Sequence, residues 1–175
     1  MILDLHDIIS TADKSMEVSV LPEKEFFVSA AGSFPISSKK PFLLRLFNDD
    51  NKRLRITGST EVELTIPCDR CLEEVKVPVA IYIEREAELS DGVLVPDPDE
   101  ETDTFLQGEQ LDVDRLIDDE ILVNWPTKVL CREDCKGICP KCGQNLNQRD
   151  CGCDRQVLDP RMAKFQDVFK EYKEV

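Results

Sequence analysis

The sequence predicts an α+β protein that is rich in antiparallel β-structure, arranged as an open sheet or a partial barrel with a long hairpin. Two stretches of alternating apolar residues, at 54–66 and 75–83, predict the hairpin. A helix near 112–124 follows, and a second helix is expected near the C-terminus, with a knuckle of six cysteines between them. We therefore expect a β-rich domain over residues 1–125 and a Cys-rich part with a C-terminal helix over residues 126–175.

The N-terminal third gives a weak signal, with strands expected at 16–21 and 42–47. The hairpin signal is much clearer, because apolar and mostly β-branched residues occupy alternating positions. In the first strand they stand at even positions: Leu54, Ile56, Val62, Leu64 and Ile66. In the second strand they stand at odd positions: Val75, Val77, Val79, Ile81 and Ile83. The connection at 67–74 carries Cys68 and Cys71, so we expect a cysteine pair at the hairpin tip.

Residues 90–110 are rich in proline and acidic side chains, which predicts an exposed loop. A docking segment for a basic partner is the alternative. Asp112 can cap the next helix, whose apolar face carries Leu116, Ile117 and Ile121. Asp159 and Pro160 are the residue types of an N-cap and a first helical position. The helix that they begin offers a docking face for the chain's own core or, alternatively, for a partner: Met162, Phe165, Phe169 and Tyr172.

The formal net charge of −14 argues against non-specific binding to a nucleic-acid backbone. The charge is uneven, because residues 1–125 carry 12 basic and 28 acidic residues, whereas residues 126–175 carry ten and eight. An acidic body of this kind suits a basic partner. The first residues lack the basic start of a signal peptide, and no apolar run approaches the ~18 residues of a membrane span. We therefore expect a cytoplasmic protein without a membrane partner.

Eight cysteines in a reducing compartment indicate metal or redox chemistry rather than disulfides. A structural zinc ion takes four soft ligands in a tetrahedron, and two cysteines separated by two residues can reach it from one turn. Cys139 and Cys142 form such a pair, with a proline and a glycine that favour the turn. Cys151 and Cys153 complete a four-thiolate set, in which Cys139, Cys142 and Cys151 are the firmest candidates.

The other four cysteines leave the pairing open. Cys68 and Cys71 can share a second zinc ion with Cys131 and Cys135. Alternatively, one site joins Cys68 and Cys71 to the pair at 139 and 142, and the remaining cysteines hold no metal. We therefore expect one or two zinc ions, with all eight cysteines as candidate ligands. A site that includes Cys68 and a tail cysteine would make folding depend on metal.

Other interpretations of the cysteines need a context that the sequence lacks. The spacing of Cys135, Cys139 and Cys142 also holds iron–sulfur clusters in radical enzymes, but those enzymes carry it early in a long βα barrel. Cys68 and Cys71 are candidates for a redox dithiol, but acidic neighbours oppose thiolate formation and no βαβ unit surrounds them. With one histidine and no phosphate loop, HExxH or GxSxG motif, we expect no catalytic residue and no enzyme.

The order of these motifs resembles the YceD-like family of bacteria and plastids over essentially the whole chain. The resemblance rests on the hairpin tip at 67–73, the helix at 111–122, the cysteine segment at 131–147 and two short motifs, Cys151–Gly152–Cys153 and Asp159–Pro160–Arg161. It implies a factor that supports accumulation of large-subunit ribosomal RNA, and not an enzyme. Genes of that family often lie beside the gene for a small zinc-containing ribosomal protein of the large subunit. The resemblance implies no particular RNA-contacting residue.

The expected partners are therefore the pre-ribosomal large subunit, its ribosomal RNA or a basic ribosomal protein, with no small-molecule substrate. Two clusters of basic residues are candidates for an RNA contact, with ordinary solvated charge as the alternative: Lys52, Arg53 and Arg55 on the hairpin, and Arg132, Lys136, Lys141 and Arg149 beside the knuckle. Two other functions stay open. One is a zinc-ribbon interaction module in transcription or another RNA process, and the other is a thiol redox or metal-sensing protein.

Overall fold

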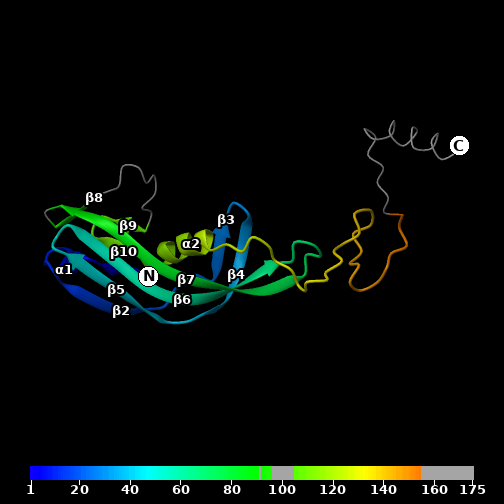
Figure 1. Cartoon of the computed structure of the whole chain (residues 1–175), viewed down its shortest axis with the longest axis horizontal. Coiled ribbons are helices and arrows are strands. Elements are labelled where there is room, and N and C mark those ends of the chain that lie inside the picture. Colours follow the sequence, from blue (N-terminus) through cyan, green and yellow to red (C-terminus); the bar gives the residue numbers. More distant parts are fainter. Residues whose placement is uncertain (91, 96–104, 155–175) are drawn as a thin grey trace, which may run out of the picture. The chain divides into compact units, whose positions relative to one another are not determined.

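The computed structural model describes residues 1–90, 92–95 and 105–154 (Figure 1). The chain divides into two compact units: unit 1 comprises residues 1–68 and 73–129, and unit 2 comprises residues 69–72 and the chain from residue 130. The helix predicted from Asp159 lies outside the described residues. The elements in chain order are β1 (Ile2–Asp4), α1 (His6–Ile9), β2 (Ser15–Val20), β3 (Phe26–Ser29), β4 (Gly32–Lys39), β5 (Phe42–Asp49), β6 (Arg53–Pro67), β7 (Glu74–Ser90), β8 (Val93–Val95), β9 (Leu106–Gln107), β10 (Gln110–Asp112) and α2 (Val113–Val123).

Most strands of unit 1 form one seven-stranded antiparallel sheet, which is organised around the long strand β6. β7 pairs with the whole length of β6, from Pro67 opposite Glu74 to Arg53 opposite Glu88. On its other edge, β6 pairs first with β5 and then with β4. β2 lies beyond β5, and β3 lies beyond β4. The predicted open antiparallel sheet with a long hairpin is therefore confirmed, and the described strands form no closed barrel.

The alternation that predicts the hairpin is also the pattern of its burial. Leu54, Ile56 and Ile81 are fully buried, whereas Tyr82 is 72% exposed on the opposite face. Successive side chains of a strand point to opposite faces, so one face of the sheet builds the core and the other faces solvent. The strands predicted at 16–21 and 42–47 are confirmed as β2 and β5.

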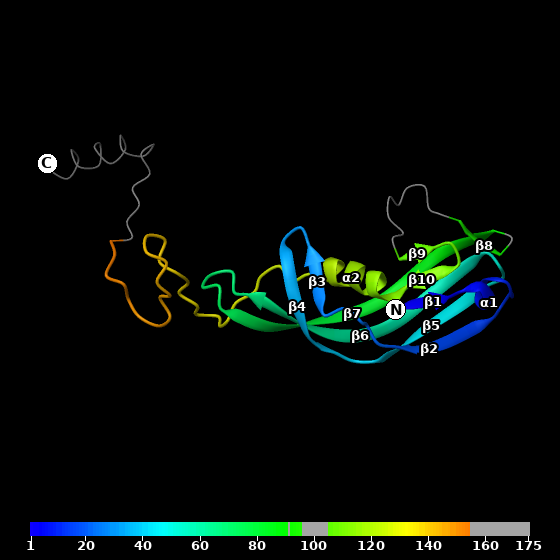
Figure 2. The same ribbon diagram turned by 180° about the vertical axis from the view of Figure 1, so that it is seen from behind.

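Two helices and a small three-stranded sheet, in the order β1-β10-β9, complete the core of unit 1. Figure 2 shows them from behind, with α2 beside β7. α2 begins at its predicted cap, because the Asp112 side chain accepts hydrogen bonds from the backbone amides of Asp114 and Arg115. Its predicted apolar residues are buried: Leu116, Ile117 and Ile121. No helix in the described part of the chain combines the length and the apolar character of a membrane span.

The only tryptophan of the chain lies just after α2, in an aromatic cluster. Trp125 packs on Phe27 of β3 and Phe34 of β4, with ring centroids 5.4 and 4.9 Å away. Both phenylalanines are buried. The fluorescence of Trp125 therefore reports on the packing of unit 1.

Several elements of unit 1 were not predicted. No sequence pattern predicted α1, β1, β3 or β4. The exposed loop expected at 90–110 is wrong at its ends, where β8, β9 and β10 form. Phe105, also within that range, is buried. Residues 91 and 96–104 lie outside the described part of the chain.

Candidate metal centres

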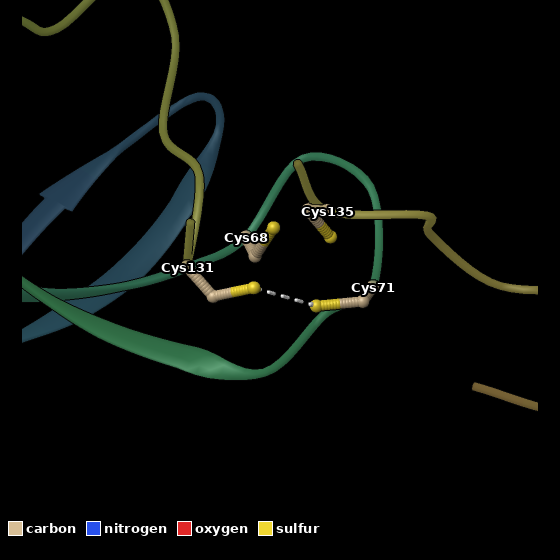
Figure 3. Close-up of side chains that lie close together, drawn as sticks. All are labelled: Cys68, Cys71, Cys131 and Cys135. Atoms are coloured by element: carbon tan, nitrogen blue, oxygen red, sulfur yellow. Dashed lines mark hydrogen bonds between the residues drawn. The ribbon is translucent and has the colours of Figure 1, made fainter. Parts of the chain in front are cut away.

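Four cysteines meet at the connection between β6 and β7 (Figure 3). Cys68 and Cys71 come from the connection itself, and Cys131 and Cys135 come from the segment that follows unit 1. We term these four the inner tetrad. Their Sγ atoms all lie within 4.8 Å of one another, and those of Cys71 and Cys131 are 3.5 Å apart. A zinc ion with Zn–S bonds of ~2.3 Å would place four sulfurs about 3.8 Å apart, so the arrangement fits one ion.

The other four cysteines form a second group, which we term the outer tetrad: Cys139, Cys142, Cys151 and Cys153. Their Sγ atoms also lie within 4.8 Å of one another. No disulfide joins any of the eight cysteines, all of which lie in the described residues. Of the two pairings left open by the spacing, the structure has the one that gives two four-thiolate groups. Whether these groups hold metal stays a prediction.

A closed turn brings the thiols of Cys68 and Cys71 within 4.8 Å of each other. The Cys68 amide donates a hydrogen bond of 2.8 Å to the carbonyl oxygen of Glu73, which closes the turn. Leu72 reverses the chain with a φ of 63°. A non-glycine residue in this left-handed region is uncommon and costs conformational energy. The closed turn therefore prearranges two of the four ligands.

Within unit 2, the tail segment is fixed on Arg70 of the same connection. The Arg70 Nη1 atom donates to the Cys135 carbonyl oxygen at 2.8 Å. In return, the Ile138 amide donates to the Arg70 carbonyl oxygen at 3.0 Å. Gly137 lies between these contacts with a φ of 77°, and a Cβ atom there would lie 2.9 Å from the Arg70 carbonyl oxygen. Only glycine fits this approach without displacement of the backbone.

We expect Gly137→Ala to destabilise unit 2 by about 2 kcal/mol, through left-handed strain and the contact with Arg70. Gly143→Ala is the matched control, because Gly143 has a φ of 72° but open space where a Cβ would stand. The control should cost only about 1 kcal/mol. Hydrogen exchange of the Leu146 amide, which donates to the Gly137 carbonyl oxygen, measures both effects. Equal costs for the two variants would contradict the close approach to Arg70.

Asn147 supports the inner tetrad, although no local motif marks it as a functional residue. Its Nδ2 atom lies 3.3 Å from the Cys135 Sγ atom, and its Oδ1 atom accepts from the Lys136 amide and the Arg132 guanidinium at 2.8 and 2.9 Å. The hydrogen bond from Asn147 is the main cause that lowers the pKa of the Cys135 thiol. Donors of this kind stabilise the thiolate that binds metal.

We expect Asn147→Ala to weaken metal binding at the inner tetrad about 10- to 100-fold, the usual cost of losing a partner that orients a ligand. Competition with a chromophoric chelator measures this affinity. Glu133→Gln is the control, because this exposed side chain lies between two candidate ligands, Cys131 and Cys135. The affinity of the Glu133→Gln variant for metal should stay within about threefold of that of the unaltered protein. Equal losses in both variants would mean that Asn147 has no specific role.

The outer tetrad has its own electrostatic signature. The amides of Cys142 and Lys141 donate to the Cys139 sulfur and lower the pKa of that thiol to about 6. The neighbouring sulfurs of Cys142 and Cys151 raise the pKa of Cys153 to about 12. Four thiols this close do not all ionise near neutral pH unless a cation offsets their charge. A divalent, thiophilic ion supplies that charge, so the donor set fits zinc.

Five of the seven basic residues considered as RNA contacts are paired with polar or acidic neighbours. Arg53 and Arg55 both pair with Glu86, at 3.5 and 3.0 Å, and Lys52 pairs with Asp50. Beside the knuckle, the side chains of Arg132 and Arg149 also have partners within unit 2: Asp134 and Asn147 for the first, and Gln144 for the second. Lys136 and Arg149 line a surface pocket of about 380 Å³.

The family model for the large ribosomal RNA subunit accumulation protein YceD matches residues 56–169, which include most of the hairpin and both tetrads. A protein of Mycobacterium bovis and two of Mycobacterium tuberculosis are each 28% identical over 110 residues, covering 63% of this chain and 53% of theirs. A chloroplastic protein of Arabidopsis thaliana, named as a YCED homolog for large ribosomal RNA subunit accumulation, is 27% identical over 134 residues, covering 62% and 42%. The chain thus spans about half the length of these relatives. No solved structure matches it.

Proposed function

Because the chain belongs to the YceD family of large ribosomal RNA subunit accumulation proteins, we propose that it supports the accumulation of large-subunit ribosomal RNA as a non-catalytic, zinc-stabilised factor. The family match over residues 56–169 is the observation that carries this proposal. The protein acts in the cytoplasm on pre-ribosomal particles, as a binding protein that catalyses no reaction. Its only histidine, His6, is exposed and lies within hydrogen-bond distance of Glu109, with 3.0 Å between Nδ1 and Oε2.

Zinc is the metal proposed for both tetrads. Two groups of four thiols suit a tetrahedral ion with a preference for sulfur. All four positions of each group are occupied by cysteine, which leaves no open position for a substrate, as is typical of structural rather than catalytic zinc. When bound, the ions supply cross-links that hold the loops of unit 2. The residues Cys68, Cys71, Cys131 and Cys135 would hold one ion, and Cys139, Cys142, Cys151 and Cys153 the other.

A basic ribosomal protein is the proposed direct partner, in preference to bare RNA. The first 125 residues carry a net charge of −16, and Arg53 and Arg55 of the hairpin are already paired with carboxylates. Such a surface repels phosphates over a Debye length of about 10 Å but attracts lysine- and arginine-rich segments.

Depletion of the protein in cells tests the proposed function. We expect the ratio of large- to small-subunit ribosomal RNA to fall, with a loss of large subunits in sucrose gradients, and the unaltered gene should restore both. Complementation with reversed charges at Arg132, Lys136, Lys141 and Arg149 then separates the two kinds of contact. Restored ratios would favour a protein partner, whereas failed rescue by a folded variant would favour RNA. An unchanged ratio after depletion would overturn the proposed function.

Metal analysis of the full chain, purified without chelator, tests the proposed cofactor separately. We expect about two zinc ions per chain, one for each tetrad. Iron together with acid-labile sulfide would overturn the assignment in favour of an iron–sulfur cluster. This measurement does not depend on the ribosomal phenotype, so the proposed cofactor and the proposed function are tested independently.

A further inference from the structure

The two tetrads differ in how far their cysteine residues are exposed to solvent. In the inner tetrad, Cys68, Cys71 and Cys135 are buried, and only Cys131 is half-buried. In the outer tetrad Cys139 alone is buried, whereas Cys142 is exposed and the other two are half-buried: Cys151 and Cys153. Small oxidants react with cysteine according to thiolate character and exposure, so the two groups should differ in reactivity.

The backbone around the outer tetrad is also open. Gly143 follows Cys142, and Gly152 separates Cys151 from Cys153, with φ angles of 72° and 67°. Apart from the two chain neighbours of each glycine, a Cβ atom built on either one would meet no atom within 4 Å. By contrast, a Cβ atom built on Gly137 beside the inner tetrad would lie only 2.9 Å from the Arg70 carbonyl oxygen. A peroxide molecule thus approaches the outer tetrad more easily than the three buried cysteines of the inner tetrad.

We propose that the outer tetrad is an oxidation site, at which peroxide joins two cysteines in a disulfide and releases the bound zinc, while the inner tetrad keeps its ion. This inference rests on the zinc binding proposed above. It adds a second role to the outer tetrad, because the same four cysteines would stabilise unit 2 and respond to oxidising conditions.

The reaction balances with one peroxide for each outer site. A zinc-bound thiolate, that of the exposed Cys142 first, attacks a peroxide oxygen, the O–O bond breaks, and a sulfenic acid forms. A second thiolate, from Cys151 or Cys153, attacks that sulfur and displaces hydroxide, so that one S–S bond forms. Two electrons pass from the two sulfurs to peroxide, and two protons from solvent complete two water molecules. Two thiolates remain, which are too few to retain the zinc ion against solvent.

The test uses the full chain loaded with zinc and treated with hydrogen peroxide. A chromophoric chelator follows metal release, and peptide mass spectrometry locates the disulfide. We expect one of two zinc ions to leave at least about tenfold faster than the other, together with one disulfide among the outer cysteines. A dithiol reductant and added zinc should restore the starting state.

Two double-cysteine variants show which tetrad holds the zinc ion that leaves faster. Cys142→Ser with Cys153→Ser should abolish the fast phase, whereas Cys71→Ser with Cys131→Ser should leave it. Where a variant does not fold, cadmium NMR of the unaltered protein gives the same information, because peroxide should remove one of two tetrathiolate resonances. Equal release rates, a disulfide within the inner tetrad, or one ion held by the inner tetrad alone would each overturn the proposal. If the tetrads bind no zinc, the protein will already lack metal before peroxide is added, so this outcome is distinguishable from a failure of the oxidation proposal.

Discussion

Removal of metal by a strong chelator is expected to unfold unit 2 and to leave unit 1 folded. Among the described residues of unit 2, the buried apolar side chains are almost all cysteines: Cys71, Cys135 and Cys139, with Leu146 beside them. Such a segment has no hydrophobic core of its own. Structural zinc sites contribute about 10–16 kcal/mol in small zinc-binding peptides, far more than the few hydrogen bonds of these loops.

Hydrogen exchange and fluorescence read the two units separately. The amides of Ile138, Cys139 and Leu146 are hydrogen-bonded within unit 2, so they should lose protection when metal is removed. Trp125 lies in unit 1 against Phe27 and Phe34, so its emission should not change. Excess zinc added with the chelator is the control and should preserve all protection. Protected unit 2 amides in metal-free protein would show that metal does not hold these loops.

Asn48→Leu is expected to destabilise unit 1 by about 3 kcal/mol, because it leaves several buried backbone groups without their hydrogen-bond partner. Asn48 is fully buried. Its Nδ2 atom donates to the carbonyl oxygens of Ile8 and Thr11 at 2.9 and 3.0 Å and to the Asn51 side chain at 2.9 Å. Its Oδ1 atom accepts from the Asn51 amide at 2.9 Å. One side chain thus holds the α1 region against the end of β5.

Urea unfolding followed by circular dichroism measures this cost. The matched control is Asn124→Leu, because Asn124 is exposed and its side chain makes a single hydrogen bond of 2.9 Å to the Glu120 carbonyl oxygen. The control should cost about 1 kcal/mol or less. If both variants lost the same stability, the buried hydrogen bonds of Asn48 would not be the cause.

The sequence was most informative where a pattern repeats many times. β6 and β7 were predicted because their apolar positions alternate over many residues, and α2 because Asp112 and a helical stripe agree. α1 has four residues and β9 has two, which is too short for a periodic signal. In β4 the polar residues and Pro35 hide a strand that is specified by its pairing with β6 and β3. These elements depend on tertiary contacts rather than on local pattern.

The cysteines were predictable as a set, but their grouping was not. Spacing shows that Cys68 and Cys71 can reach one ion, but it does not show which distant pair approaches them. That approach depends on contacts of Arg70 with Cys135 and Ile138, which no local motif records. Gly137 was the available signal, since a glycine between two cysteines often marks a left-handed or crowded backbone position. Asn147 gave no signal, because asparagine is common in turns.

The register of the long hairpin has a consequence for how genes of this family can change in length. β6 and β7 pair without a bulge from residues 53 and 88 to residues 67 and 74. One inserted or deleted codon in either strand would reverse the faces of all side chains beyond it and turn buried residues toward solvent. Such a change would also shift Cys68 or Cys71 relative to their neighbours. We therefore expect relatives to vary in length outside residues 53–88, and alignments that place gaps within this range to be misaligned.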